Sequence, residues 1–238
     1  QWGTFITTPN VSEDKADVAI STEIINSYDN ERELSLTTIL YGPLGDEIGR
    51  TTKGIVIKPG ETLKINQLLP VQKPQCWSPD SPSLYSARLS VAENNREIDS
   101  ILESFGIRTI SYSAEEGFKL NGNSLLLNGG CIHHDNGPLG AAAFDRAEIR
   151  KVQLMKEAGF NAVRTSHNHP SEVFLHACDS IGLLVIDEAF DGWRVAKKPH
   201  DYSTLIDKYW KDDLSALVLR DRNHPSIFCW SVGNEVIE

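Results

Sequence analysis

The sequence lacks the features of several protein classes. It has no excess of basic residues, because 33 Asp and Glu outnumber 23 Lys and Arg and give a net charge of −10. A nucleic-acid binder needs a positive surface to meet phosphates. No apolar run approaches the roughly 20 residues that span a bilayer, and residues 1–10 have neither the basic start nor the apolar core of a secretory signal. We therefore expect neither a nucleic-acid nor a membrane partner, and no signal peptide in this chain.

Cysteine is also scarce. The four cysteines of the 238-residue chain are far apart and include no CxxC pair; they are Cys76, Cys131, Cys178 and Cys229. A chain of this length can build a core without disulfides. We expect free and mostly buried thiols. The content of 40% hydrophobic and 24% charged residues is ordinary for a globular protein and argues against wholesale disorder.

The first part of the chain, residues 1–111, has the pattern of β-structure. Its apolar runs alternate with polar residues or are rich in β-branched residues, and turns of Asn, Asp, Gly and Pro separate them. The expected strands cover residues 16–25, 34–41, 54–58, 84–91 and 105–110. Short strands at this spacing predict an immunoglobulin-like β-sandwich domain. Only one Cys lies in this half, which excludes the disulfide of antibody domains.

Residues 112–238 alternate between strand and helix patterns. The expected strands cover residues 124–129, 160–164, 183–187 and 226–232. Asp145, with Glu148 three residues later, is the expected N-cap of a first helix, and Ser171 is that of a second helix, which ends at Gly182. A third helix is expected at about residues 204–222. Strands that are apolar throughout predict a parallel sheet that is buried on both faces, with helices outside.

A polar cluster follows each of these four strands. The clusters contain His133, His134 and Asp135, then Arg164 to His169, then Asp187, Glu188 and Asp191, and finally Asn234 and Glu235. The first strand is not followed by a Gly-rich phosphate loop, which argues against a dinucleotide-binding fold. TIM barrels build their active sites at the carboxyl ends of their strands, so the pattern predicts the first four βα units of a (β/α)8 TIM barrel. Half a barrel has two open sheet edges, and we therefore expect a piece of a longer protein.

Several motifs resemble glycoside hydrolase family 2 enzymes of the β-galactosidase type. The most specific is Trp230-Ser231-Val232-Gly233-Asn234-Glu235. The other segments with this resemblance are Leu120-Asn121-Gly122, residues 133–140, 161–167, 187–191 and 220–226, and in the first half residues 76–85 and 105–108. The resemblance covers nearly the whole chain. It implies an immunoglobulin-like sandwich domain at 1–111, followed at 112–238 by the N-terminal half of a TIM-barrel glycosidase domain.

The chemistry that the resemblance implies is retaining exo-hydrolysis of terminal β-galactosides. Retaining glycosidases use two carboxyl groups about 5–5.5 Å apart, one as acid/base and one as nucleophile. In the family the Glu of the Asn-Glu pair is the acid/base, which implies this role for Glu235, while Asn234 is implied to bind the sugar 2-hydroxyl. The family's nucleophile comes from the seventh strand, which this sequence does not reach. We therefore expect the chain alone to be inactive.

Two further residues, Arg164 and His167, gain a role from the resemblance. It places the Arg near the nucleophile and the His on the sugar, although Arg164 could equally be a structural ion-pair partner. His133 and His134 are adjacent, so their side chains point apart in an extended chain and one of them is expected to face the substrate.

The third strand is followed by three more candidates for substrate binding. Asp191 and Trp193 stand where hydroxyl-binding and sugar-stacking groups are expected. Asp187 and the neighbouring Glu188 could bind substrate, cap a loop or pair with Arg164.

The sequence also departs from the family. After the first strand, residues 128–134 read Asn-Gly-Gly-Cys-Ile-His-His, where the best-known β-galactosidases carry Arg-Gly-Val-Asn-Arg-His-Glu. Those enzymes have a Glu-x-His metal pair where this chain has Asp191-Gly192-Trp193. We therefore expect no required cofactor and no magnesium site of that kind, although a divalent cation stays open. The galactoside is favoured by the pattern of residues 133–140, and a glucuronide or a mannoside stays open.

Two hypotheses from other functional classes stay open. His167-Asn168-His169, with His133, Asp135 and Asp187, could ligate a metal in a metal-dependent barrel hydrolase. The chain could also be a non-catalytic carbohydrate-binding fragment. The glycosidase and the carbohydrate-binding hypotheses both predict a carbohydrate as the partner. An open barrel face could also support a homo-oligomer, and a bacterial cytoplasm or periplasm both stay open as the compartment.

Overall fold

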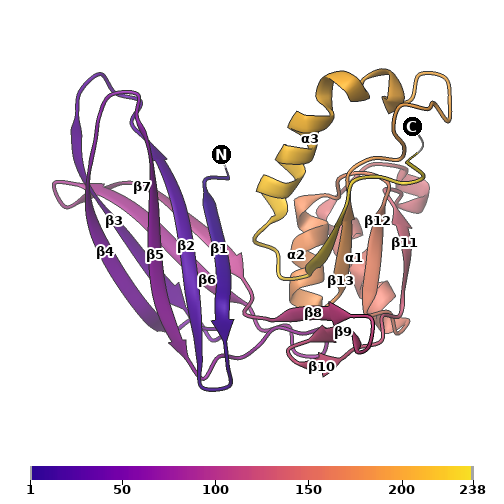
Figure 1. Cartoon of the computed structure of the whole chain (residues 1–238), viewed down its shortest axis with the longest axis horizontal. Coiled ribbons are helices and arrows are strands. Elements are labelled where there is room, and N and C mark those ends of the chain that lie inside the picture. Colours follow the sequence, from indigo (N-terminus) through magenta and orange to yellow (C-terminus); the bar gives the residue numbers. More distant parts are fainter. Residues whose placement is uncertain (1, 237–238) are drawn as a thin grey trace. The chain divides into compact units, whose positions relative to one another are not determined.

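The computed structural model describes residues 2–236 and divides into two compact units. The first unit contains residues 1–77 and 83–109, and the second contains residues 78–82 and 110–238. Figure 1 shows the first unit as strands only and the second as a mixture of strands and helices. Within residues 2–236, no helix combines the length and the apolar character needed to cross a bilayer.

The first unit is a sandwich of two antiparallel sheets. One sheet has the order β1-β2-β5, with the bounds Thr4–Val11, Lys15–Ile25 and Thr62–Gln72. The other has the order β4-β3-β6-β7, with the bounds Glu47–Ile57, Arg32–Tyr41, Tyr85–Glu93 and Arg96–Phe105. Apolar side chains from both sheets form one buried core, in which Val18 and Ile65 from the first sheet meet Leu36 and Leu89 from the second. This is the immunoglobulin-like architecture expected from the sequence.

Three strands of the sandwich were not expected from the sequence. These are β1, β5 and β7, and the strand expected at residues 105–110 is wrong, because only its end residues belong to strands, Phe105 to β7 and Ile110 to β8. Strand β7 is an edge strand whose polar residues are mostly exposed, so it lacks an apolar pattern. In β5 every second residue from Ile65 to Val71 is buried, but the polar Gln67 is among the buried residues and Leu68 and Pro70 are among the exposed ones, so the apolar alternation is lost.

The second unit begins with a small antiparallel sheet of order β10-β9-β8, with the bounds Asn123–Ser124, Gly117–Leu120 and Ile110–Ser113. A parallel sheet follows in the order β11-β12-β13-β14, with the bounds Gly129–His133, Ala162–Ser166, Leu184–Glu188 and Ile227–Ser231. The first barrel strand was expected at residues 124–129, which is wrong. The leucines of that segment are apolar, but Leu126 is 78% exposed and lies outside any strand.

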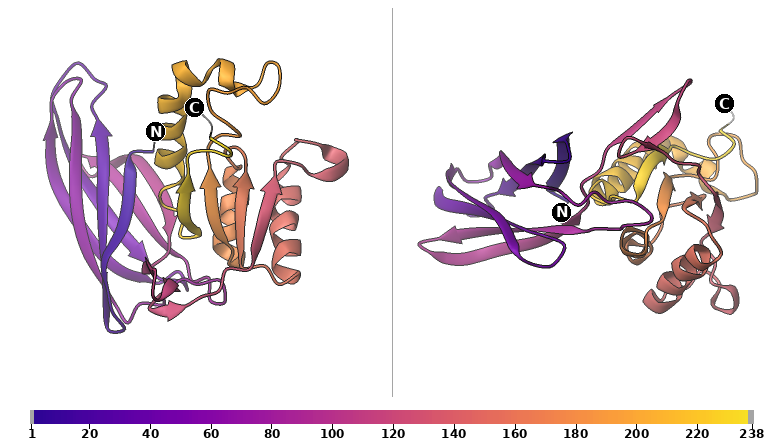
Figure 2. Two further views of the ribbon diagram at one scale, coloured as in Figure 1. Left: turned by 45° about the vertical axis from the view of Figure 1, so that its right-hand side comes forward. Right: turned by 90° about the horizontal axis from the view of Figure 1, so that it is seen from below.

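Three α-helices lie between the strands of the parallel sheet: α1 (Asp145–Glu157), α2 (Glu172–Ile181) and α3 (Ile206–Asp221), with short 3-10 turns at Gly137–Leu139 and Tyr202–Thr204. Helices α1 and α2 lie on the same side of the sheet (Figure 2). Val152 and Phe174 from these helices share a core with Val163 and Val185 of β12 and β13. The structure thus forms the sequence of strands and helices expected for the first half of a (β/α)8 barrel.

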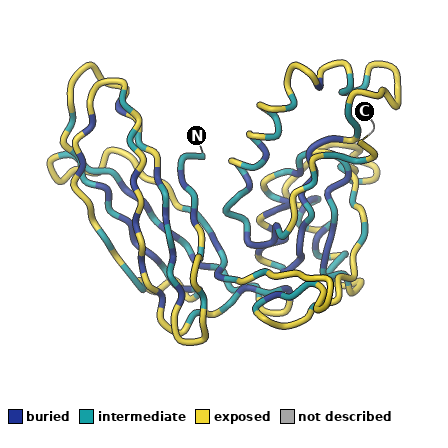
Figure 3. Tube along the Cα trace, in the orientation of Figure 1, coloured by how far each residue is buried: buried dark blue, intermediate teal, exposed yellow. Residues whose placement is uncertain are grey.

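The opposite face of the parallel sheet is covered much less. Residues Cys131, Arg164, Ile186 and Cys229 lie in register across the four strands. The two central residues are half-buried and the two cysteines are exposed, while β12 and β13 are otherwise largely buried (Figure 3). Burial on both faces therefore holds for the central strands and not for β11 and β14. All four cysteines are free as expected, but only Cys178 is buried, since Cys131 and Cys229 project from the open face.

Of the two helix N-caps expected from the sequence, the structure shows one. The Ser171 side chain accepts a hydrogen bond from the Phe174 backbone N–H, which confirms it as the N-cap of α2. Asp145 is instead the first helical residue of α1 and caps nothing. Gly182 ends α2 with φ of +88°, and a Cβ at this position would lie 2.2 Å from the Pro79 carbonyl oxygen. Lys156 donates hydrogen bonds to the carbonyls of Pro79 and Gly182 at 2.7 and 2.9 Å, which ties residues 78–82 to this unit.

Candidate active site

The carboxyl ends of β11 to β14 lie at one edge of the parallel sheet. His133 is the last residue of β11, Glu188 is the last of β13, and Ser231 is the last of β14. Parallel strands in consecutive order bring the residues that follow them side by side. Most of the polar residues expected at a common rim are therefore gathered there.

Glu188 is the centre of this rim and its side chain is fully buried. Oε2 accepts hydrogen bonds from Arg164 Nε at 2.9 Å, from Arg164 Nη2 at 2.5 Å and from Ser231 Oγ at 2.6 Å. Oε1 lies 2.6 Å from Nδ1 of His167, which follows a cis peptide bond. A buried carboxylate needs such partners to offset its desolvation. Glu188 therefore holds in place the side chains of Arg164 and His167, which the sequence predicted at this rim.

Asn234 and Asp191 extend this network outward. Arg164 Nη2 donates to Asn234 Oδ1 at 3.1 Å, and Asn234 Nδ2 donates to Asp191 Oδ1 at 3.3 Å. The backbone N–H of Asn234 donates to the Phe190 carbonyl at 2.8 Å, which fixes the chain after β14. Asp191 Oδ1 also lies 3.9 Å from Nε2 of His167. The structure thus brings together four of the residues predicted for substrate binding.

Glu235, the expected acid/base, stands at the solvent side of the network. Its side chain is 69% exposed, and its Oε2 lies 2.9 Å from Nζ of Lys197. Lys197 also pairs with Asp191 Oδ1 at 3.0 Å. Burial raises the pKa of Asp191, but hydrogen bonds from Lys197 and Asn234 outweigh it and leave the pKa below its usual value. The contacts with Glu235 and Asp191 raise the pKa of Lys197.

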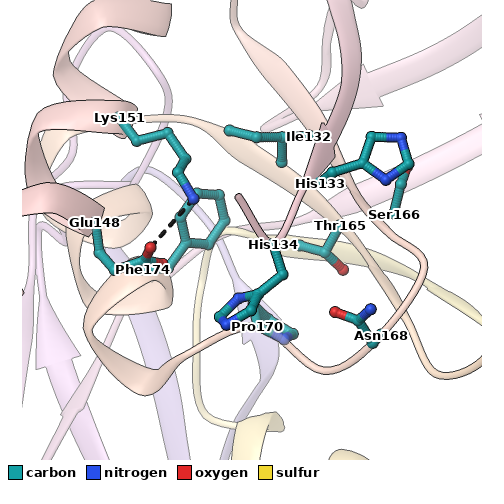
Figure 4. A pocket seen from close by; sticks show the side chains of 10 residues that line it. All are labelled: Ile132, His133, His134, Glu148, Lys151, Thr165, Ser166, Asn168, Pro170 and Phe174. Atoms are coloured by element: carbon teal, nitrogen blue, oxygen red, sulfur yellow. Dashed lines mark hydrogen bonds and ion pairs between the residues drawn. The ribbon is translucent and has the colours of Figure 1, made fainter. Parts of the chain in front are cut away.

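His133 and His134 point apart, as expected for adjacent residues at a strand end. The His133 ring packs edge-on against His167 with 5.2 Å between centroids, on the side of the network. Both histidines line a small cavity, and His134 faces it together with Lys151 and Phe174 (Figure 4). This cavity has a volume of about 20 Å³, enough for one water molecule and not for a sugar. His134 thus lies beside His133 and Asn168 at this cavity and outside the hydrogen-bond network of Glu188.

Asp187 is also outside the group. Its side chain is fully buried on the face of β13 that carries Val185 and packs against the helices, where Thr165 Oγ1 lies 3.5 Å from Oδ1. Burial and the neighbouring Asp221 carboxylate raise the pKa of Asp187 to about 8. Glu188, which is one residue later and on the opposite face, joins the network at the rim in its place.

Trp193, which was expected to stack on a sugar, packs against other aromatic rings in the structure. Its ring lies 5.8 Å from that of Phe190 and 5.9 Å from that of Trp210. These rings belong to an apolar cluster with Ile206 and Leu217 under the loop that follows β13. The side chain thus supports the loop that carries Asp191 and Lys197.

The histidines and carboxylates considered as metal ligands are not gathered into one site. Among residues 2–236, the one group of three side chains close enough for a shared ion consists of His176, Asp179 and His224, with ligand atoms within 4.8 Å. It lies before β14, where Asp179 accepts from the Ser226 backbone N–H at 3.1 Å and contacts His224 Nδ1 at 2.5 Å. None of the expected rim ligands belongs to this group.

Two residues of the site were not predicted from the sequence. Ser231 at the end of β14 binds Glu188, and Lys197 joins Asp191 to Glu235. The alternation of β14 could have placed Ser231 on the same face as Cys229. Lys197 lies in an irregular loop and follows no periodic pattern, so the sequence offered no signal for it.

Two family profiles match the chain. The profile described as "Glycosyl hydrolases family 2, TIM barrel domain" matches residues 113–238, and the profile "Glycosyl hydrolases family 2" matches residues 3–108. Together they account for most of both units.

Individual relatives agree with these profiles. The chain is 41% identical over 237 residues to "Beta-galactosidase BoGH2A" of Bacteroides ovatus, covering all of this chain and 28% of that protein. It is 38% identical to a "Putative beta-glucuronidase" of Formosa agariphila, covering 97% of this chain and 22% of that protein. A solved structure of a glycosyl hydrolase family 2 member from Bacteroides cellulosilyticus superposes with a TM-score of 0.96 at 48% identity, covering 99% of this chain and 30% of that one. The Bacteroides uniformis β-glucuronidase structure gives a TM-score of 0.88 at 32% identity, covering 98% and 28%. The chain thus spans less than a third of the length of these relatives.

Proposed function

The chain belongs to glycosyl hydrolase family 2, and from this premise we propose that it carries the acid/base side of a retaining exo-β-glycosidase that removes terminal β-galactosides. Glu235 is the acid/base, and Asn234 binds the sugar next to the bond that breaks. Arg164, His167, His133 and Asp191 complete this side of the site. The proposal assigns the nucleophile to a carboxyl group outside residues 1–238.

The observation that carries the proposal is the contrast among the carboxyl groups at the rim. Both oxygens of Glu188 are engaged, and its side chain is fully buried. Asp191 is 62% exposed, and both Lys197 and Asn234 donate to its Oδ1. Glu235 directly follows the anchored Asn234, is 69% exposed and contacts Lys197 through Oε2, so a glycosidic oxygen can reach the other oxygen of its carboxyl group. General acid catalysis requires this access, because the acid must lie within hydrogen-bond reach of the atom it protonates.

The two steps of a retaining mechanism use Glu235 in both directions. In the first step Glu235 gives its proton to the glycosidic oxygen as that oxygen leaves C1, while the nucleophile carboxylate forms a bond to C1. In the second step the ionised Glu235 takes a proton from water. The water oxygen then bonds to C1, the bond to the nucleophile breaks, and the sugar is released. A hydrogen bond from the Asn234 side chain to the 2-hydroxyl strengthens as positive charge develops at C1.

A neutral sugar fits the electrostatics of the described rim. The two cations that contact its carboxylates, Arg164 and Lys197, are each paired with negative charge already. A glucuronide would add a carboxylate to a site in which these cations are engaged. This favours the galactoside, in agreement with the printed name of the Bacteroides ovatus relative. The glucuronide and the mannoside are the alternatives within the same family.

The proposal is tested by the hydrolysis of 4-nitrophenyl β-galactoside, β-glucuronide and β-mannoside. The assay compares the 238-residue chain with the complete polypeptide that contains it. We expect turnover of the galactoside by the complete polypeptide alone. Glu235→Gln should lower this rate by about 10²–10⁴-fold, the usual contribution of a general acid or base.

The matched control is Glu157→Gln, which changes an exposed carboxylate at the end of α1 and should leave the rate unchanged. Faster hydrolysis of the glucuronide or the mannoside would change the assigned substrate and leave the proposed mechanism unchanged. Hydrolysis by the 238-residue chain alone, or full activity of Glu235→Gln, would contradict the assignment of the two carboxyl groups.

A further inference from the structure

The side chain of Lys197 links Asn234 and Glu235: it contacts Glu235 directly and Asn234 through Asp191. Asn234 Nδ2 donates to Asp191 Oδ1 at 3.3 Å, and Lys197 Nζ donates to the same oxygen at 3.0 Å. Lys197 Nζ also lies 2.9 Å from Glu235 Oε2. One ammonium and one carboxylate from the loop after β13 therefore brace two consecutive residues after β14.

The loop around Lys197 is built to hold that side chain. The Asp201 carboxylate accepts hydrogen bonds from the backbone N–H groups of Lys197 at 2.7 Å, of Lys198 at 3.0 Å and of Ser203 at 3.0 Å. These contacts, with the strongest from the Ser203 side chain, lower the pKa of Asp201 to about 2. The carboxylate is therefore ionised at any working pH and keeps the backbone of Lys197 in place.

The stem of Lys197 is also packed. It runs alongside Gly192, where a Cβ would lie 3.4 Å from Cε of Lys197, an ordinary van der Waals contact. Below the loop, Phe190 and Tyr202 stack with 5.2 Å between ring centroids. The side chain of Lys197 is only 27% exposed. An ordinary exposed ion pair contributes little because two long side chains must be immobilised to form it. Here the loop has already restricted the lysine.

We propose that Lys197 is a positioning residue for the acid/base step, holding the Glu235 carboxyl beside Asn234 and stabilising the negative charge that appears on Glu235 as it releases its proton. This inference rests on the proposed function. The proton moves from Glu235 to the leaving oxygen, and the carboxylate that remains faces the fixed ammonium of Lys197. A preorganised charge that interacts more strongly with the developing carboxylate than with the neutral acid lowers the barrier of this step.

The step has a signature that a merely structural role lacks. Proton donation matters when the leaving group is basic and hardly at all when it is a stabilised anion. Phenyl β-galactoside and 2,4-dinitrophenyl β-galactoside provide these two cases with one sugar. The ratio of their kcat/KM values reports the acid, because kcat/KM covers only the steps up to the departure of the leaving group.

The experiment measures both substrates with the complete polypeptide and its variants. Lys197→Met should lower kcat/KM by about 10–100-fold for the phenyl glycoside and by less than about 3-fold for the dinitrophenyl glycoside, within the usual range of acid catalysis. Lys197→Arg should recover most of the loss, and Lys198→Met should change neither value. Glu235→Gln sets the reference ratio.

The outcomes separate the inference from the proposed function. An equal loss on both substrates in Lys197→Met, or no loss, would overturn the inference while the Glu235→Gln ratio still supports the acid. If Glu235→Gln shows no leaving-group dependence, the proposed function fails, and the Lys197 role in it fails too. A crystal structure of the complete polypeptide is independent of activity: Lys197 Nζ within 3.5 Å of a Glu235 oxygen supports the inference, and separation of the two overturns it.

Discussion

The two units of the chain use the two faces of a β-sheet in different ways. In the sandwich unit, each sheet covers the inner face of the other, and alternate residues such as Val18 and Leu89 meet in one core. In the barrel unit, α1 and α2 cover one face of the parallel sheet. The other face carries Arg164 in the row that ends in two exposed cysteines. The same alternation therefore gives a core in one unit and a half-open polar face in the other.

The two units also differ in where their charged side chains lie. The sandwich keeps ion pairs such as Arg88–Glu97 on its surface, where both side chains are well exposed. The barrel unit buries Glu188 completely and surrounds it with Arg164, His167 and Ser231. A buried carboxylate is costly and tolerates little displacement of its partners. The fully or almost fully buried carboxylates, Glu148, Asp179, Asp187, Glu188 and Asp221, all lie in the barrel unit, and Glu188 is the one that belongs to the candidate site.

The largest effect should come from breaking that buried charge. Glu188→Ala leaves Arg164 and His167 without their acceptor, and we expect a loss of about 3–5 kcal/mol in the unfolding free energy of the barrel unit. Urea unfolding followed by tryptophan fluorescence measures it. Glu97→Ala in the sandwich is the matched control and should change little. Equal effects of the two variants would remove the distinction between the units.

The next effect tests the core of the sandwich. Leu36 is fully buried between the two sheets. Leu36→Ala creates a cavity there and should cost about 3 kcal/mol in the unfolding of this unit, while activity of the complete polypeptide at a temperature where it stays folded is unchanged. Leu44 is 91% exposed, so Leu44→Ala serves as the control. Similar losses in both variants would contradict the assigned core.

A smaller effect should appear in the pH dependence of the barrel unit. Burial and Asp221 raise the pKa of Asp187 to about 8, so the folded chain holds a proton that the unfolded chain releases near pH 4. The stability contributed by this proton is complete below pH 4 and is lost as the pH rises toward 8. Asp187→Asn should therefore flatten the decline between pH 5 and 8 and raise stability at pH 8 by more than about 1 kcal/mol. An unchanged slope in unfolding experiments would show that Asp187 is ionised.

The smallest effect distinguishes two helix starts. Ser171 caps α2 through the Phe174 N–H at 3.1 Å, so Ser171→Ala should cost about 1 kcal/mol. Asp145 forms no cap bond, so Asp145→Ala should cost only the few tenths of a kcal/mol of its charge near the helix start. Thermal unfolding of both variants makes the comparison. A larger loss for Asp145→Ala would restore the cap that was expected from the sequence.

The sequence predicted most of the fold because periodic patterns decide it. Central strands such as β2, β3 and β13 have apolar residues at regular positions, and the expected ranges match them closely. The prediction failed for strands that form through pairing with neighbouring strands and have no apolar pattern of their own. One is the exposed edge strand β7, and the other is β11, which follows a more apolar but exposed leucine segment. Gly129 in β11 has little intrinsic strand preference. It lies there because a Cβ would be 2.5 Å from the Ala162 carbonyl oxygen, so only glycine allows the close approach of the two strands.

The site shows the same limit at the level of single residues. The strand ends predicted that Arg164, His167, Asn234 and Glu235 share one rim, because parallel strands bring their ends together. The choice between Asp187 and Glu188 depends on a register of one residue, which reverses the face of the sheet. Lys197 depends on the path of an irregular loop that Asp201 organises. Such a path is decided by tertiary contacts and leaves no pattern in the sequence.

The role of Glu235 is tested most directly by the product that an acid/base variant forms with azide. In Glu235→Ala of the complete polypeptide, water lacks a base for the second step, while azide needs none and can attack C1 itself. With 2,4-dinitrophenyl β-galactoside we predict that sodium azide restores turnover and that NMR detects the β-galactosyl azide, whose configuration is retained. Formation of the α-azide would make Glu235 the nucleophile, and the absence of any azide product would contradict its role in the retaining mechanism.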